Sequence, residues 1–135
     1  MITTFEDTVR QLQIIVDERP RHVYRPPAVD RMCRYADDLP GVGLVPGCLL
    51  GHWLHRFHRI DLGRLALATG YNIERILPDL IYEGRIDEAD DRIRLIRFLG
   101  LLQEAQDAEV PWGRALSETL VLIAQKMPVR EAVPA

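Results

Sequence analysis

Apolar residues recur at helical spacing along most of this chain, which predicts a mainly helical protein. The first helix is expected to begin at Thr3, which can form a capping box with Glu6. It should end at Arg19-Pro20, because the residue before a proline avoids the helical conformation. Its apolar stripe consists of Phe5, Val9, Leu12 and Val16.

Three shorter helices are expected in the middle of the chain. One begins near Cys48, a second follows the capping residue Asp61, and a third follows Asn72. Gly70 suits the left-handed turn after the second of these helices. Pro78 lies inside the third apolar pattern and should kink or split that helix.

Two longer helices are expected towards the end of the chain. Asp87 can cap the first, whose acidic first turn matches the helix dipole and which should end near Ala108. Its apolar residues, from Ile93 to Leu102, cover a wide arc, which indicates a central buried helix. Pro111 suits the first position of the last helix.

The connection between the first two helices has a different composition. Residues 20–47 contain five prolines and three glycines, and such a long connection is usually functional or mobile. We expect Val23-Tyr24 to be extended and residues 30–35 to form one helical turn. Because the connection also holds residues of buried type, such as Tyr35, it should pack on the helices.

These patterns predict an all-α fold, an irregular bundle or orthogonal array of about five to six helices with a long Pro/Gly-rich loop. The 135 residues suit one domain, which we expect over residues 1–128, with residues 129–135 as a flexible C-terminal tail. The composition, 47% apolar and 27% charged, is that of an ordinary globular protein.

The net charge, the length of the apolar runs and the number of cysteines restrict the classes of function that we expect for this chain. The net charge of −3 argues against binding nucleic acid through bulk charge. No run approaches the ~20 apolar residues that span a bilayer, and the first residues lack the pattern of a signal peptide. Two cysteines are too few for a disulfide scaffold, so a cytoplasmic protein is expected.

The helix that begins at Cys48 carries the most informative chemistry. On a helical wheel Cys48, His52, His55 and Arg59 share one stripe. Cys48 with His52, or His52 with His55, could share a metal ion, but Cys48 and His55 lie about two turns apart. Cys33 from the preceding connection could complete a zinc site with Cys48 and His52. We expect no cofactor, with zinc as the alternative.

Other interpretations of this helix stay open. Cys48 is more typical of a small buried apolar residue, although a cysteine at a helix N-terminus can also be a reactive thiol. His52, His55, Arg56 and Arg59 form a basic surface. Such a surface could bind an acidic protein or a phosphate backbone.

Residues 62–81 have the spacing of a helix-turn-helix, with Ala66, Gly70 and Ile76 at the positions that allow close helix approach and a tight turn. The outward positions of the second helix would include Glu74 and Asp79, which repel phosphate. An ordinary helical corner is therefore the first interpretation, and DNA binding is the alternative.

Two residues near the end of the chain suggest contacts with partners. Trp112 follows Pro111 and most simply seals one end of the core, although tryptophan is also enriched among interface anchors. Leu122 lies off the apolar stripe of the last helix, which is consistent with a homodimer contact.

Several short segments occur in a fixed order: Arg19-Pro20, Val23-Tyr24, Pro26-Pro27, Cys33-Arg34-Tyr35, residues 46–52, Leu54-His55-Arg56, Ala105-Gln106-Asp107 and residues 112–116. In these features the chain resembles a group of small uncharacterised proteins from actinobacteria and their bacteriophages. His58 stands where those proteins often have glycine. The resemblance implies an accessory protein of a phage or an actinobacterium, with Cys33 and Cys48 in one structural unit, and it implies no activity.

No motif is specific enough to name a reaction, so we expect a non-enzymatic accessory or interaction protein, encoded by or derived from a phage, that binds a host protein. One alternative is a small DNA-binding regulator that uses residues 62–81. Another is a zinc- or thiol-dependent protein centred on Cys33, Cys48 and His52. The expected binding residues are His52, His55, Arg56, Arg59 and Trp112.

Overall fold

The computed structural model describes residues 3–25 and 34–127 of the chain. These residues form six helices and a two-stranded hairpin, so the expected helical fold is confirmed with one addition. In chain order the elements are α1 (Phe5–Glu18), β1 (Ala36–Leu39), β2 (Gly43–Pro46), α2 (Leu49–His58), α3 (Leu62–Leu67), α4 (Ile73–Tyr82), α5 (Arg92–Asp107) and α6 (Trp112–Lys126).

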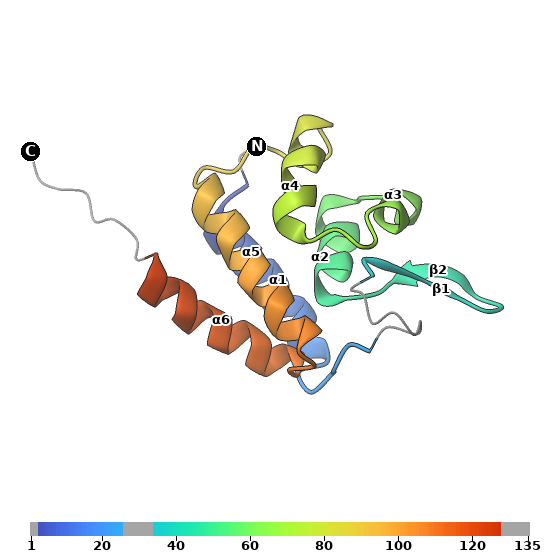
Figure 1. Cartoon of the computed structure of the whole chain (residues 1–135), viewed down its shortest axis with the longest axis horizontal. Coiled ribbons are helices and arrows are strands. Elements are labelled where there is room, and N and C mark those ends of the chain that lie inside the picture. Colours follow the sequence, from blue (N-terminus) through green and yellow to red (C-terminus); the bar gives the residue numbers. More distant parts are fainter. Residues whose placement is uncertain (1–2, 26–33, 128–135) are drawn as a thin grey trace, which may run out of the picture.

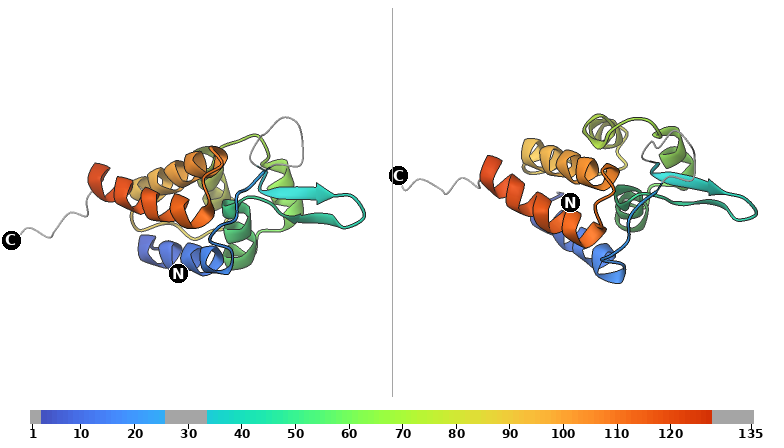
Figure 2. Two further views of the ribbon diagram at one scale, coloured as in Figure 1. Left: turned by 90° about the horizontal axis from the view of Figure 1, so that it is seen from below. Right: turned by 60° about the horizontal axis from the view of Figure 1, so that its bottom comes forward.

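The helices α1, α5 and α6 lie side by side and form one half of the molecule (Figure 1). The other half contains α2, which packs on both α1 and α5, and α4, which packs on α5. The short helix α3 packs against both strands of the hairpin. The hairpin itself projects beyond the helices, as the two further views show (Figure 2). None of the described helices is both long and apolar enough to cross a lipid bilayer.

The hairpin replaces part of the connection that was expected to be irregular. Its strands pair antiparallel with Ala36 opposite Pro46 and Leu39 opposite Gly43. Gly41 and Gly43 have φ values of 76° and 95°, which a residue with a side chain rarely adopts. Residues 22–25 form neither helix nor strand, and most of the helical turn expected over residues 30–35 lies outside the described residues.

Two expected helix starts are wrong, the first by one residue and the second by four. Thr4 caps α1 by accepting a hydrogen bond from the Asp7 amide, whereas Thr3 pairs with Ala89 in an isolated parallel bridge. The cap of α5 is Asp91, which accepts from the Arg94 amide, so the acidic residues 87–90 precede the helix. In both places several neighbouring polar residues could cap a helix. The tertiary contacts between Thr3 and the segment before α5 decide which of these residues do so.

The other boundaries agree with the sequence pattern. Asp61 and Asn72 cap α3 and α4 through their side chains, and Gly70 adopts the left-handed conformation between these helices with a φ of 92°. Pro78 was expected to kink or split its helix, and the second of these alternatives is wrong, because α4 continues through Pro78. Pro111 stands at the cap position of α6, one residue before its expected place.

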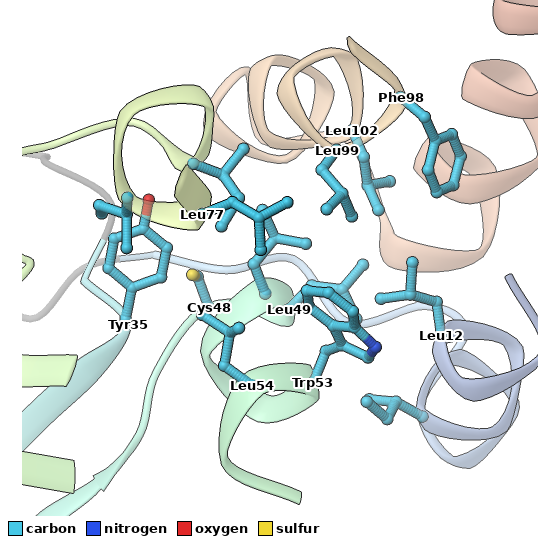
Figure 3. Packing of buried hydrophobic residues seen from close by; sticks show 14 of the residues in the cluster. Leu12, Tyr35, Cys48, Leu49, Trp53, Leu54, Leu77, Phe98, Leu99 and Leu102 are labelled. Carbon is cyan, nitrogen blue, oxygen red and sulfur yellow. The ribbon is translucent and has the colours of Figure 1, made fainter. Parts of the chain in front are cut away.

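The buried apolar side chains of the described residues form one cluster. Figure 3 shows Trp53 and Leu49 of α2 facing Leu99 and Leu102 of α5, with Leu12 of α1 beside them. The central buried position expected for α5 is thus confirmed for its second half. Its first turn is different, because Ile93 is 75% exposed.

Two buried glutamines on α5 satisfy the first amides of two other helices. The Ile73 amide at the start of α4 donates to Gln103 Oε1 at 2.7 Å, and the Leu49 amide at the start of α2 donates to Gln106 Oε1. Gln103 also donates to the Tyr35 hydroxyl at 2.7 Å. The first amides of a helix have no partner within the helix, so α5 orients α2 and α4 through these bonds.

Candidate functional site

A hollow of about 440 Å³ lies where the end of α1, residues 22–25, the hairpin and the start of α2 meet. Apolar side chains of the hairpin and of Val23 form part of its wall. Arginine, histidine, tyrosine and aspartate side chains form the rest. The described residues that line it are Arg19, His22, Val23, Tyr24, Arg25, Asp37, Leu39, Val45, Pro46, Gly47 and His52.

Three of the nitrogen-bearing side chains around this hollow gather on one buried indole. The rings of His22 and His52 meet the Trp112 ring edge to face, with centroids 4.5 and 5.5 Å away. The Arg19 guanidinium lies 5.2 Å from the centroid of the same ring, and its Nη2 donates to His52 Nε2 at 3.3 Å. We refer to Arg19, His22, His52 and Trp112 as the Trp112 cluster.

Main-chain bonds hold the Trp112 cluster together. The Trp112 amide donates to the His22 carbonyl at 2.9 Å, and the Gly113 amide donates to the Pro20 carbonyl at 2.8 Å. These amides open α6, where no carbonyl of the helix itself can accept them. The chain that leaves α1 is therefore fixed to the start of α6, and this fixes the position of His22.

Burial keeps the two imidazoles of the cluster neutral. Desolvation, followed by the charge of Arg19, lowers the pKa of His52 from 6.5 to about 4. The same two causes lower the pKa of His22. Both rings are therefore uncharged at neutral pH, and His52 Nε2 can accept the bond from Arg19.

The hollow also contains one buried carboxyl group. Asp37 accepts a hydrogen bond from the Tyr24 hydroxyl at 3.0 Å, and both residues are less than a tenth exposed. Desolvation raises the pKa of Asp37, against the opposing effects of the Tyr24 bond and of the nearby Arg34 charge. The bond between Tyr24 and Asp37 thus holds residues 22–25 against the hairpin at the hollow.

Segments noted separately in the sequence lie together here. The amides of Gly47 and Cys48 donate to the carbonyls of Tyr35 and Arg34 at 3.0 and 2.9 Å. Gly51 lies so close to the Tyr35 main chain that a Cβ atom would collide with it. The residues next to Cys33 are therefore folded against the start of α2, while Cys33 itself lies outside the described residues.

The expected stripe on α2 is not one continuous polar surface. Cys48 is fully buried, and Figure 3 shows its sulfur among Tyr35, Leu49 and Leu77. This burial agrees with the interpretation of Cys48 as a small apolar core residue. His52 lies in the hollow, half-buried against Trp112.

The other expected binding residues of α2 point to local structural roles. His55 donates from Nδ1 to the Ile60 carbonyl at 2.9 Å, which supports the turn after α2. Arg56 forms an ion pair with Glu18 of α1 at 2.8 Å. Arg59 is exposed and ends α2 in the left-handed conformation with a φ of 55°. Of the expected binding residues, only His52 and Trp112 belong to the Trp112 cluster.

A metal site has no complete ligand set within the described ranges. No group of three histidine, cysteine, aspartate or glutamate side chains in residues 3–25 and 34–127 is placed to hold a metal ion. The proposed zinc ligands Cys48 and His52 point to different surroundings, the core and the hollow. Cys33, the third proposed ligand, falls outside those ranges.

The residues of the helix-turn-helix pattern form α3 and α4, but their packing differs from that motif. Helix α3 has six residues and packs on the hairpin, whereas α4 packs on α5. On α4, Arg75 lies over the Tyr71 ring. The Arg64 guanidinium of α3 is bound to Glu83 at 2.8 Å. This surface offers few cations that could contact phosphate.

Sequence reasoning missed Arg19, His22 and Asp37 as site residues. Each lies in or beside the Pro/Gly-rich connection, where no periodic pattern shows which side chains face one another. The sequence signal that they share is their closeness to segments noted for other reasons. Arg19 belongs to Arg19-Pro20, His22 precedes Val23-Tyr24, and Asp37 follows Cys33-Arg34-Tyr35 by two residues.

Comparison with protein-family models, with curated proteins and with solved structures finds no match to this chain.

Proposed function

We propose that this chain is a non-enzymatic accessory protein that binds another protein through the hollow beside the hairpin. The observation that carries this proposal is the hollow itself, about 440 Å³, which is open and has both apolar and charged walls. Protein interfaces combine an apolar centre with a polar rim in this way. A segment of a partner could place an apolar side chain against Leu39 and Val45 and a polar one beside the Trp112 cluster.

The hairpin adds a second means of contact. It projects from the helices, and each of its strands pairs with one other strand in the described part of the chain. The outer edge of a strand offers main-chain donors and acceptors to an added extended segment. The exposed side chain of Val42, 71% accessible at the tip, extends this surface.

The biological setting of the proposal rests on the sequence resemblance alone. On that basis we propose an accessory protein of an actinobacterium or of its phage, with a host protein as partner. A homodimer through α6 is part of the same proposal, because Val121 and Leu122 leave apolar side chains on its outer face at 57% and 40% exposure.

The proposal is tested by affinity capture from an actinobacterial extract, with the wild-type chain and two variants as baits. Val45→Lys places a charge in the hollow, and Ile93→Lys places the same charge at an exposed site on α5. We expect one protein to be captured by the wild type and by Ile93→Lys, and to be lost with Val45→Lys. Equal capture by all three baits, or capture of no specific protein, would overturn the proposal.

A further inference from the structure

We propose that the hollow recognises the carboxylate of an acidic side chain in an extended segment of the partner protein, with Arg19 as its main ligand. This inference rests on the proposed function and names the chemistry of what is bound. It begins from the placement of Arg19, whose guanidinium is exposed at the hollow and has no carboxylate partner among the described residues.

Two other arginines near this end of the molecule have carboxylate partners. Arg56 binds Glu18 at 2.8 Å, and Arg25, the other arginine that lines the hollow, lies 3.8 Å from Glu109. Arg19 instead stacks on Trp112 and donates one bond to a neutral imidazole. A planar guanidinium held against an aromatic ring keeps its other N–H groups in one orientation, which suits a carboxylate that accepts two of them.

The imidazoles complete the site for an anion. His22 and His52 both line the hollow, and both contact the Trp112 ring over which Arg19 lies. The charged groups that act on His52 are Arg19, the neighbouring His22 and His55, and Glu18, which alone favours its protonation. A carboxylate bound at Arg19 would add a second negative charge there, so binding should raise the pKa of both rings.

The surroundings favour one carboxylate over a polyanion. Asp37 lies within the hollow, Glu18 precedes Arg19, and Glu109 is beside Arg25. Because Arg25 is paired, Arg19 is the arginine of the described lining that is left without a carboxylate, whereas the binding of a nucleic-acid backbone needs several unpaired cations in a row. The apolar wall formed by Val23, Leu39 and Val45 suits the aliphatic part of a peptide. A glutamate or aspartate next to an apolar residue therefore fits the hollow best.

The inference is tested by NMR titration of the histidine rings with three probes. These are the peptide acetyl-Leu-Glu-Leu-amide, the same peptide with glutamine in place of glutamate, and inorganic phosphate. We expect the glutamate peptide to shift the His22 and His52 ring signals saturably and to raise both ring pKa values. The glutamine peptide and phosphate should cause much smaller shifts. Equal shifts with the glutamine peptide, or stronger binding of phosphate, would overturn the choice of carboxylate.

Two variants assign the effect to Arg19. Arg19→Gln should abolish the saturable shift, whereas Arg21→Gln, at an exposed arginine outside the hollow, should leave it unchanged. The folded state of each variant is checked by the dispersed NMR spectrum.

The results that would overturn the inference differ from those that would overturn the proposed function. A partner that is lost with Val45→Lys but kept with Arg19→Gln would overturn the inference alone, and a chain that captures no partner would overturn both.

Discussion

At the scale of single residues, Gly51 has the least room for a side chain among the glycines within helices. A Cβ atom there would collide with the main chain of Tyr35, which cannot move without disturbing the bond that its carbonyl accepts from the Gly47 amide. We expect Gly51→Ala to lower the free energy of unfolding by about 3 kcal/mol, at the upper end of the cost of overpacking. Chemical denaturation of the purified variant measures this loss.

Gly63 provides the matched control for that substitution. It lies in α3, it is exposed, and a Cβ atom there would meet its nearest neighbour, Asp61 Oδ2, at an ordinary 3.4 Å. Gly63→Ala should be neutral or stabilise the protein by about 0.5–1 kcal/mol, the gain of alanine over glycine in a helix. Equal losses for the two variants would contradict the close approach at Gly51.

The neutral imidazole of His52 makes stability depend on pH. Its pKa is about 4 in the folded protein and 6.5 without burial, so between these values the unfolded chain binds more protons. Stability should therefore fall as the pH is lowered from about 6.5 towards 4. The raised pKa of Asp37 opposes this effect only near and above 3.8, where the folded state binds the extra proton.

The measurement is the melting temperature at pH 7.5 and at pH 5. For the wild type we expect a fall of several degrees, to which the lowered pKa of His22 also contributes. His52→Gln, which does not titrate, should show a smaller fall than the wild type between the same two pH values. An identical fall would mean that His52 is not the group responsible.

At the scale of elements, α5 organises its neighbours through polar side chains as well as apolar ones. Gln103→Met keeps the size of the side chain and leaves the Ile73 amide at the buried start of α4 without its acceptor. We expect a loss of about 1–3 kcal/mol in the free energy of unfolding, the cost of an unsatisfied buried donor. Gln125→Met on the exposed face of α6 should change stability by less than about 0.5 kcal/mol.

The same elements show what sequence reasoning could and could not reach. Apolar periodicity predicted all six helices, because each must bury one stripe against the others. It could not predict the hairpin, whose strands have four residues each and include two adjacent aspartates. It also could not show that Gln103 and Gln106 cap distant helices, since such bonds depend on how α2, α4 and α5 meet.

For the site, the sequence indicated two members of the Trp112 cluster. His52 and Trp112 were expected among the binding residues, and their ring centroids lie 5.5 Å apart. Arg56 was expected on the same surface but forms an ion pair with Glu18, a residue 38 positions away in the chain. Long-range ion pairs of this kind leave no trace in local periodicity.

At the scale of the whole molecule, the outer face of α6 is the surface proposed for self-association. Ser117, Glu118, Val121 and Leu122 border a shallow, mainly apolar depression of about 420 Å³. We expect light scattering to show a dimer at high protein concentration and a monomer for Leu122→Lys. A wild-type chain that stays monomeric at high concentration would contradict this proposal without affecting the hollow.

The hollow brings together five separate parts of the chain: the end of α1, residues 22–25, the hairpin, the start of α2 and, beneath it, the start of α6. This convergence is one reason that we propose the hollow as the binding site. The Arg19 guanidinium lies on the Trp112 ring beside the apolar side chains of the hollow. It should contribute much of the free energy with which the hollow binds one acidic side chain of the partner.

The proposed contact at Arg19 is tested most directly by the dissociation constant of the captured partner for the wild type, Arg19→Gln and Arg21→Gln, measured by calorimetry at one salt concentration. We expect Arg19→Gln to weaken binding by about tenfold or more, because one member of a charged pair is lost, and Arg21→Gln to weaken it by less than about twofold. Equal dissociation constants for the wild type and Arg19→Gln would contradict the proposed contact.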